Sequence, residues 1–183
     1  MTISDLQIER YARHILLPEI GGAGQSKLIN SSVLVIGAGG LGSPVILYLA
    51  AAGVGTIGII DGDTVELSNL QRQIIHTTPK IGTHKVESAR DTVKSINPDV
   101  ELQLYKERFT KDNALSLLQH YDIVADGSDN FDTRFLLNDA CYLTGTTLVS
   151  AAILRFDAQL STYKAHLKTG QRKHPCYRCI FPE

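Results

Sequence analysis

The sequence predicts an α/β fold of the doubly wound, Rossmann-like kind with a mostly parallel sheet. Strand-like and helix-like segments alternate along most of the chain, which is typical of parallel sheets with right-handed crossovers. A glycine-rich segment, Gly37–Gly42, stands between an apolar strand and an apolar helix. A second apolar strand ends on Asp61, about twenty residues further on, where a dinucleotide fold places its ribose-binding acid. These observations favour a nucleotide site; a purely structural tight turn is the alternative.

Length and composition fit one domain, divided into a helical arm (1–31), a Rossmann-like core (32–165) and a tail (166–183). Apolar residues make up 43% of the 183 residues and charged residues 20%, as in ordinary globular proteins. The net charge of −1 gives no reason to expect nucleic acid or an anionic membrane as a partner. The sequence shows neither the features of a signal peptide nor an apolar run of about 20 residues that would span a bilayer. We therefore expect a cytoplasmic protein.

The arm is predicted to be helical. Ser4 and Gln7 have the spacing of a capping box that opens a helix reaching about Leu16. The segment 17–22 contains proline and two glycines and breaks that helix, and a short helix over 25–29 leads into the sheet.

Strands and helices are predicted to alternate along the core as far as its last strand. Helix 85–96 places Val86, Ala89, Val93 and Ile96 on one face, and Asn97-Pro98 ends it. The polar stretch 62–83 has no strong periodicity. A final strand over 160–163 follows its predecessor without a helix, so we expect it to be antiparallel. The other predicted strands are 33–36, 56–60, 100–104, 122–126 and 147–152, and the other helices are 41–52, 112–119 and 130–143.

Polar residues gather where the predicted strands end, which is where such sheets bind ligands. They form three groups: Asp61 with Asp63; Asn69, Arg72, Gln73 and Lys85; and the segment 126–134. A nicotinamide cofactor needs little cationic charge, whereas a triphosphate needs cations for its phosphates and a carboxylate for Mg²⁺. Arg72 and Lys85 meet the first need of a triphosphate, and Asp129 can meet the second.

Each of these residues has a less specific interpretation. Arg72 and Lys85 can be solvated surface charges, and Asp129 can simply cap the helix that follows it. Asp126 is expected to hold a turn rather than to catalyse. Taken alone, Arg10 and Arg13 are typical of the solvated face of a helix.

The three cysteines do not make a disulfide framework. Cys176 and Cys179 form a Cys-x-x-Cys pair, which provides two of the four thiolates of a typical structural zinc site; a redox pair is the alternative. Cys141 has helical spacing with apolar residues and is expected in the core. His174, beside the pair, is treated as solvated.

Taken together, these motifs resemble the ATP-dependent adenylyltransferases related to ubiquitin-activating enzymes, the MoeB, ThiF and HesA family. The matching segments run in order across nearly the whole chain. They are Arg10-Tyr-Ala-Arg13 with Gly24-Gln25, Gly37–Gly42, Asp61-Gly-Asp63, Ser68–Gln73, Gly82–Lys85, Asp129-Asn130 with Arg134, and Cys176–Cys179.

The resemblance implies adenylation of the C-terminal carboxylate of a small ubiquitin-like sulfur-carrier protein, with ATP and Mg²⁺ as cofactors. It places Asp61 on the ribose and Asp129 on Mg²⁺, and it brings Arg13 to the γ-phosphate from the partner subunit of a homodimer. Phosphate contacts are implied for Asn69, Arg72 and Lys85. Further nucleotide contacts are implied for Gly37, Gly39, Gly40, Gly42, Asp63, Gln73 and Asn130.

One departure concerns the C-terminus. The family carries a second Cys-x-x-Cys well downstream, whereas this sequence ends at Glu183, so Cys176 and Cys179 provide half of a Zn²⁺ site. We expect a shortened form whose tail, from about Lys168, is mobile without metal. A non-catalytic binding or scaffold fragment is the main alternative function, and an NAD-dependent oxidoreductase is a lesser one.

Overall fold

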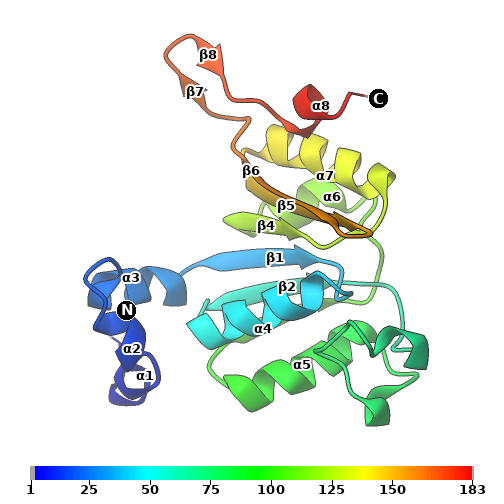
Figure 1. Cartoon of the computed structure of the whole chain (residues 1–183). Helices are drawn as coiled ribbons and strands as arrows, with labels where there is room; N and C mark the ends of the chain where they lie inside the picture. The colour runs from blue at the N-terminus through cyan, green and yellow to red at the C-terminus, as the bar shows by residue number, and fades with distance from the viewer. Residues whose placement is uncertain (1–2, 183) are drawn as a thin grey trace.

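The computed structural model describes residues 3–182, and a six-stranded sheet forms its centre (Figure 1). The strand order is β3-β2-β1-β4-β5-β6, and all neighbouring pairs are parallel except β5–β6. This confirms the predicted fold class, including the antiparallel last strand. The strands are β1 (Ser32–Ile36), β2 (Thr56–Ile60), β3 (Glu101–Tyr105), β4 (Ile123–Asp126), β5 (Thr147–Leu154) and β6 (Asp157–Tyr163).

Helices cover both faces of the sheet, and strand β1 shows why. Its side chains alternate between two separate cores, because successive residues of a strand point to opposite faces. Val33 and Val35 pack with α4 (Gly42–Ala52) and α5 (Lys85–Ile96), whereas Leu34 and Ile36 pack with α6 (Ala114–Leu118) and α7 (Phe131–Thr144). A strand buried on both sides must be apolar throughout, as this one is.

Helix α5 has the predicted bounds, and three of the four apolar residues on its predicted face, Val86, Ala89 and Val93, are buried. Ile96, the fourth residue of that face, is 37% exposed. It is the last residue of the helix, where the chain turns into Asn97.

The N-terminal arm lies at the amino ends of the strands, at the end of β1 where the chain enters the sheet (Figure 1). The capping box between Ser4 and Gln7 is present, but the single predicted helix is wrong. The chain forms α1 (Asp5–Arg10) and α2 (Ala12–Ile15), separated at Tyr11, and then α3 (Gly21–Ile29). Tyr11 is buried and its hydroxyl accepts a hydrogen bond from Nδ2 of Asn97 at 2.8 Å, a long-range contact that fixes the break.

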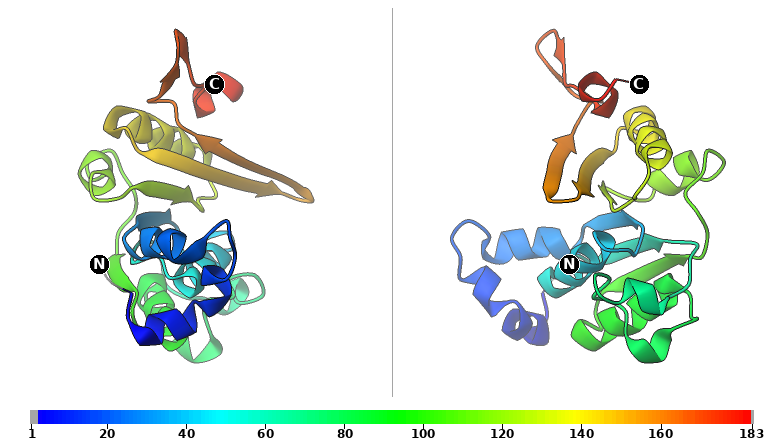
Figure 2. Two further views of the ribbon diagram at one scale, coloured as in Figure 1. Left: turned by 90° about the vertical axis from the view of Figure 1, so that its left-hand side faces the viewer. Right: turned by 45° about the vertical axis from the view of Figure 1, so that its right-hand side comes forward.

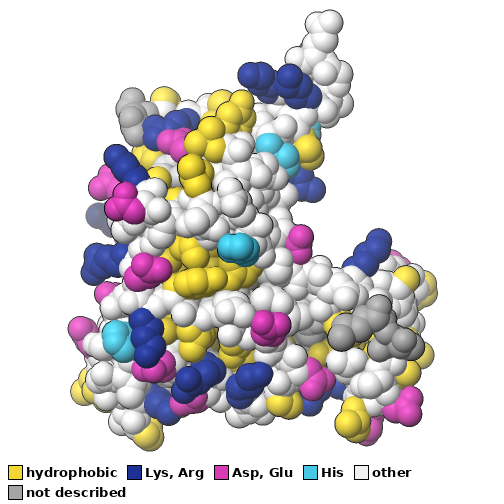
Figure 3. All heavy atoms as spheres, turned by 180° about the vertical axis from the view of Figure 1, so that it is seen from behind, with side chains coloured by type: hydrophobic (Ala, Val, Ile, Leu, Met, Phe, Trp, Pro, Cys, Tyr) yellow, Lys and Arg dark blue, Asp and Glu magenta, His cyan; other side chains and the backbone are white. Residues whose placement is uncertain are grey.

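The remaining elements are short. The stretch between β2 and α5 contains two 3-10 turns, η1 (Leu67–Asn69) and η2 (Thr78–Lys80). After β6 come the hairpin β7 (Lys168–Thr169) and β8 (Arg172–Lys173), and then helix α8 (Tyr177–Ile180). The hairpin projects from the body of the molecule, and lysine and arginine side chains gather at this projecting end (Figures 2 and 3).

Helix α8 is attached to α7 by contacts that involve no metal. The Tyr177 side chain is buried and its backbone N–H donates to Oδ1 of Asn138 at 2.8 Å. Arg178 makes an ion pair with Asp139 at 2.8 Å. These contacts offer α8 an attachment besides metal, which the sequence analysis did not anticipate; the mobility of the tail without metal stays a prediction. None of the helices within residues 3–182 has the length and apolar character needed to cross a membrane.

Candidate nucleotide site

A cavity of about 380 Å³ lies at the carboxyl ends of β1, β2 and β4. It includes the point between β1 and β4 at which the strand order reverses, the usual ligand position in doubly wound sheets. Ten of the predicted site residues line it. They are Gly37, Gly39, Gly40, Asp61, Asp63, Arg72, Gln73, Lys85, Asp129 and Asn130.

Three predicted residues do not line this cavity. Asn69 donates its side-chain N–H to Oγ of Ser68 at 3.3 Å. Gly42 is buried beneath the glycine loop, where an added Cβ would lie 1.8 Å from the Gly37 carbonyl oxygen. Arg13 is exposed on the N-terminal arm, at the opposite end of the strands.

The glycine loop is held by Asp61. Gly37 has a φ of +86°, a backbone conformation that favours glycine, and it directs the chain from β1 into the loop. The Ala38 N–H then donates to Oδ2 of Asp61 at 2.9 Å, and the Asp63 N–H donates to Oδ1 of Asp61 at 2.8 Å. Each oxygen of this carboxylate therefore already accepts one backbone hydrogen bond, and its remaining lone pairs are available to a ligand.

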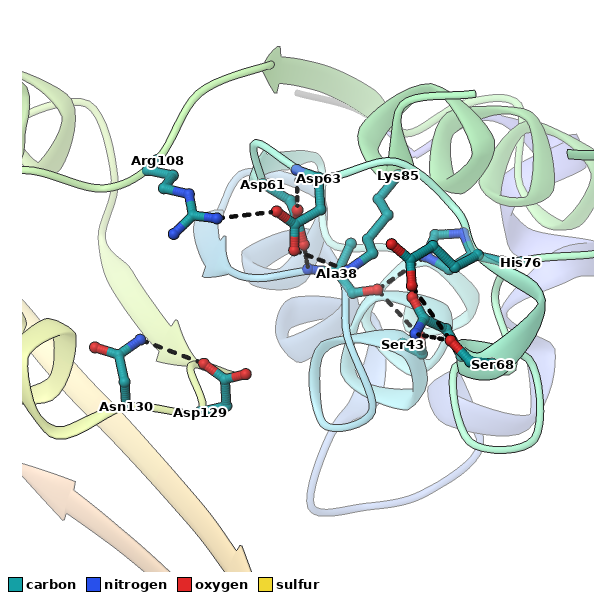
Figure 4. A network of polar contacts seen from close by, with 12 residues as sticks. Ala38, Ser43, Asp61, Asp63, Ser68, His76, Lys85, Arg108, Asp129 and Asn130 are labelled. Atoms are coloured by element: carbon teal, nitrogen blue, oxygen red, sulfur yellow. Dashed lines mark hydrogen bonds and ion pairs between the residues drawn. The ribbon is translucent and has the colours of Figure 1, made fainter. Parts of the chain in front are cut away.

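Asp63 pairs with two cations (Figure 4). Nζ of Lys85 lies 3.2 Å from one of its oxygens, and the guanidinium of Arg108 lies 3.3 Å from the other. The Lys85 side chain is only 8% exposed, so its interpretation as a solvated surface charge is wrong. Arg108 and its neighbour Phe109 also line the cavity, and neither was predicted from the sequence. They follow β3, the one strand end in this region at which no polar group was sought.

The turn after β4 presents Asp129 to the cavity. The buried Asp126 carboxylate accepts hydrogen bonds from the Ser128 N–H at 2.9 Å, the Ser128 hydroxyl at 2.7 Å and the Ser150 hydroxyl at 3.0 Å. Asp126 thus holds the turn, as predicted. The N-cap of α7 is Asn130, which accepts from the Thr133 N–H at 2.9 Å. The interpretation of Asp129 as a helix cap is therefore wrong, and its carboxylate faces the cavity.

Gln73 has an unsatisfied acceptor in the same cavity. Its side chain lies beside Gly39 and the residue is only 4% exposed. Its Oε1 atom is buried without a hydrogen-bond partner among the described residues. Buried amide oxygens are nearly always hydrogen-bonded in native proteins, so this atom is suited to a donor supplied by a ligand or water.

The donor set in the cavity suits Mg²⁺ bound together with phosphate. Asp129 has one oxygen accepting from Asn130 Nδ2 at 3.3 Å, which leaves acceptor capacity on the carboxylate. Mg²⁺ is commonly held by one or two carboxylates and by substrate phosphates.

The tail brings two cysteine thiols together. The sulfurs of Cys176 and Cys179 lie 3.6 Å apart, close enough for one metal ion. Within residues 3–182 there is no group of three or more histidine, cysteine or acidic side chains that could hold a metal. Cys141 is buried, as predicted, and burial raises the pKa of its thiol to about 12. His174, predicted to be solvated, is half-buried and hydrogen-bonds Thr169 at 2.8 Å.

Comparison with known protein families gives a match to the ThiF family over residues 11–183. The chain belongs to the ThiF family. It is 51% identical to the adenylyltransferase and sulfurtransferase MOCS3 of Culex quinquefasciatus, over 98% of this chain and 40% of that protein. It is 46% identical to the sulfur carrier protein adenylyltransferase of Thermus thermophilus, over 97% of this chain and 65% of that protein.

Solved structures of similar fold include nucleotide complexes. Escherichia coli tRNA N6-threonylcarbamoyladenosine dehydratase, TcdA, in complex with ATP is 28% identical, with a TM-score of 0.77 over 82% of this ThiF-family chain and 61% of that chain. Escherichia coli MccB with AMPCPP and MccA is 26% identical, with a TM-score of 0.80 over 93% and 51%. The chain spans between two fifths and two thirds of the length of the two curated relatives named above.

Proposed function

We propose that this ThiF-family chain uses ATP to adenylate the C-terminal carboxylate of a small ubiquitin-like sulfur-carrier protein. The observation that carries the proposal is that three cations and the carboxylate of Asp129 line the same cavity; the cations are Arg72, Lys85 and Arg108. The names of the relatives suggest the reaction and the substrate class, and the ATP complex of TcdA supports ATP as the nucleotide.

The reaction joins two anions. A carrier carboxylate oxygen attacks the α-phosphorus, the bond to the β-phosphate oxygen breaks, and pyrophosphate leaves with that electron pair, giving an acyl adenylate. No proton needs to move and no protein nucleophile is required, so catalysis depends on positioning and on neutralising charge. Arg72 and Lys85 would neutralise phosphate oxygens, and Asp61 would accept from the ribose hydroxyls. Bound Mg²⁺, held by Asp129, would supply further neutralisation of charge.

Two alternative functions are an NAD-dependent oxidoreductase and a non-catalytic scaffold fragment. An NAD-dependent oxidoreductase would use the same loop and Asp61, but hydride transfer gives no reason for three cations beside the cavity. A non-catalytic scaffold fragment would bind ATP without forming an adenylate. Calorimetric titration with ATP–Mg²⁺ and with NAD distinguishes the adenylyltransferase from the oxidoreductase. Tighter binding of NAD than of ATP–Mg²⁺ would overturn the proposal.

The catalytic test is pyrophosphate exchange into ATP in the presence of a panel of sulfur carriers. The wild-type chain should exchange with its own carrier, and Asp129→Asn should lower the rate on the order of 10²- to 10³-fold. Asp132→Asn is the matched control, because Asp132 is an exposed carboxylate on the first turn of α7 that does not line the cavity. ATP binding without exchange in the wild type would favour the scaffold.

The proposal extends to assembly and location. Arg13 lies far from the cavity of its own chain, which is consistent with a homodimer in which it reaches the γ-phosphate of the partner. Mixing Arg13→Ala and Lys85→Ala proteins should restore part of the activity in exchanging dimers; no recovery would place the site within one chain.

We also propose a cytoplasmic protein, and a zinc site for which Cys176 and Cys179 are two of the ligands.

A further inference from the structure

His76 is a buried polar residue next to the candidate site for which the proposed reaction has no use. It lies between η1 and α5, is only 6% exposed and does not line the cavity. Its ring makes two hydrogen bonds, and Figure 4 shows the one to Ala38. Nε2 lies 2.9 Å from the Ala38 carbonyl oxygen, and Nδ1 lies 3.0 Å from the Ser88 hydroxyl.

The Ala38 residue is thereby held from two directions. Its N–H donates to Asp61, at the end of β2, and its carbonyl accepts from His76, in the loop before α5. The Ser43 hydroxyl lies 3.5 Å from the same carbonyl oxygen. The residues that follow, Gly39 and Gly40, line the cavity.

The direction of the carbonyl matters for an anionic ligand. A carbonyl oxygen carries partial negative charge and would repel phosphate, whereas backbone N–H groups attract it. Because the Ala38 carbonyl points to His76, which is outside the cavity, the oxygen is kept away from the ligand side of the loop.

The partners determine the form of the ring. A carbonyl oxygen can only accept, so Nε2 must carry a proton, and a neutral ring then leaves Nδ1 to accept from the Ser88 hydroxyl. Ser88 is itself buried on α5, which keeps this hydroxyl in place. Burial lowers the pKa of His76; the nearby Lys85 lowers it further, against the opposing effects of the Ala38 hydrogen bond and Asp61. The neutral ring is thus the stable form near pH 7.

We propose that His76 is a positioning residue of the nucleotide site, a neutral Nε2–H ring, oriented by Ser88, that turns the Ala38 carbonyl away from the phosphates. The inference rests on the proposed function only in that the loop's ligand is a nucleotide. The state of the ring and of the loop is measurable without any ligand.

The first measurement is ¹⁵N spectroscopy of the histidine ring in the nucleotide-free chain at pH 7. We expect the neutral Nε2–H tautomer, with Ser88→Ala shifting the ring toward a mixture of forms. An imidazolium, or the Nδ1–H tautomer in the wild type, would overturn the proposal.

The second measurement compares three variants by backbone amide resonances and by binding of ATP–Mg²⁺. His76→Leu removes the donor, His76→Gln keeps an Nε2–H donor, and Ile75→Val is the matched control, a neighbouring buried residue with no side-chain bond to the loop. We expect His76→Leu to shift the Gly39 and Gly40 amides and to weaken binding about three- to tenfold, the usual effect of one hydrogen bond. His76→Gln should stay within about twofold of the wild type, and Ile75→Val should leave both readouts unchanged.

A purely structural role for His76 would give a different pattern. His76→Leu and Ile75→Val would then both lower the melting temperature and leave the glycine amides and the ATP affinity unchanged, which would overturn the proposal. If the wild type binds no ATP, the proposed function fails, and the glycine amides in His76→Leu still decide whether His76 holds the loop.

Discussion

Asp61 and Asp63 are separated by one residue, yet they have different partners. Asp61 accepts two backbone N–H groups and shapes the glycine loop, whereas Asp63 pairs with Lys85 and Arg108. One carboxylate organises the backbone and the other holds the cations at the edge of the cavity.

Lys85 is expected to contribute to the reaction more than to the stability of the fold. Lys85→Met leaves Asp63 half-exposed and still next to Arg108, so the protein should remain folded. Loss of a positioned cation should lower pyrophosphate exchange on the order of 10²- to 10³-fold. Lys80→Met is the control, because Lys80 pairs with Asp91 at the surface and does not line the cavity. Equal exchange rates in the two variants would contradict the role of Lys85.

His76 gives a prediction for the pH dependence of stability. Burial lowers its folded-state pKa below 6.5, so below that pH the unfolded chain binds a proton that the folded chain does not. The free energy of unfolding should therefore fall as the pH decreases from about 7 into the range in which the unfolded histidine is protonated. Denaturant titrations should show that His76→Gln flattens this slope. A slope that is unchanged in the variant would assign it to other groups.

At the level of elements, two glycines of the loop have different tasks. An alanine Cβ at position 42 would lie 1.8 Å from the Gly37 carbonyl oxygen, which is backbone and cannot move aside. At position 40 the nearest atoms are 3.6 Å away, in the Arg72 side chain. Gly42→Ala should lower the free energy of unfolding by about 3 kcal/mol, an overpacking cost. Gly40→Ala should keep native stability and weaken ATP binding.

Melting curves and ATP titrations of the two variants provide the comparison. A stable Gly42→Ala protein would mean that α4 can move away from the loop, which would contradict the close packing described above.

Most elements follow from local patterns and were predicted closely. Strand β2 and helix α5 have the predicted bounds, since an apolar run and an amphipathic face with a following Asn-Pro are local signals. The break at Tyr11 was missed because it depends on Asn97, far away in sequence. Arg108 and His76 were missed for a related reason: their importance comes from which loops the sheet order brings together.

For the molecule as a whole, the attachment of the C-terminal segment is testable. Tyr177→Ala removes the buried side chain that joins α8 to the core, so limited proteolysis should cut near residues 168–176 much faster. Tyr142→Ala, an exposed tyrosine on α7, is the control and should be cut like the wild type. A chelator should leave the wild-type cutting rate unchanged, since Asn138 and Asp139 hold the helix without metal. Fast cutting after chelation would instead assign the attachment to zinc.

The adjacency of β1 and β4 has a consequence for the order of events during folding. Val33 pairs with Ile123, so two of the strands whose ends form the cavity meet only after a long stretch of chain has been organised between them. Such non-local pairing is slow, because the entropy of closing a long loop is lost before the contact forms. We therefore expect a partly folded chain to lack the cavity, so that nucleotide binds only the completed sheet. ATP should accordingly slow amide hydrogen exchange in β1 and β4 together, and slow the unfolding of the sheet more than it speeds its formation.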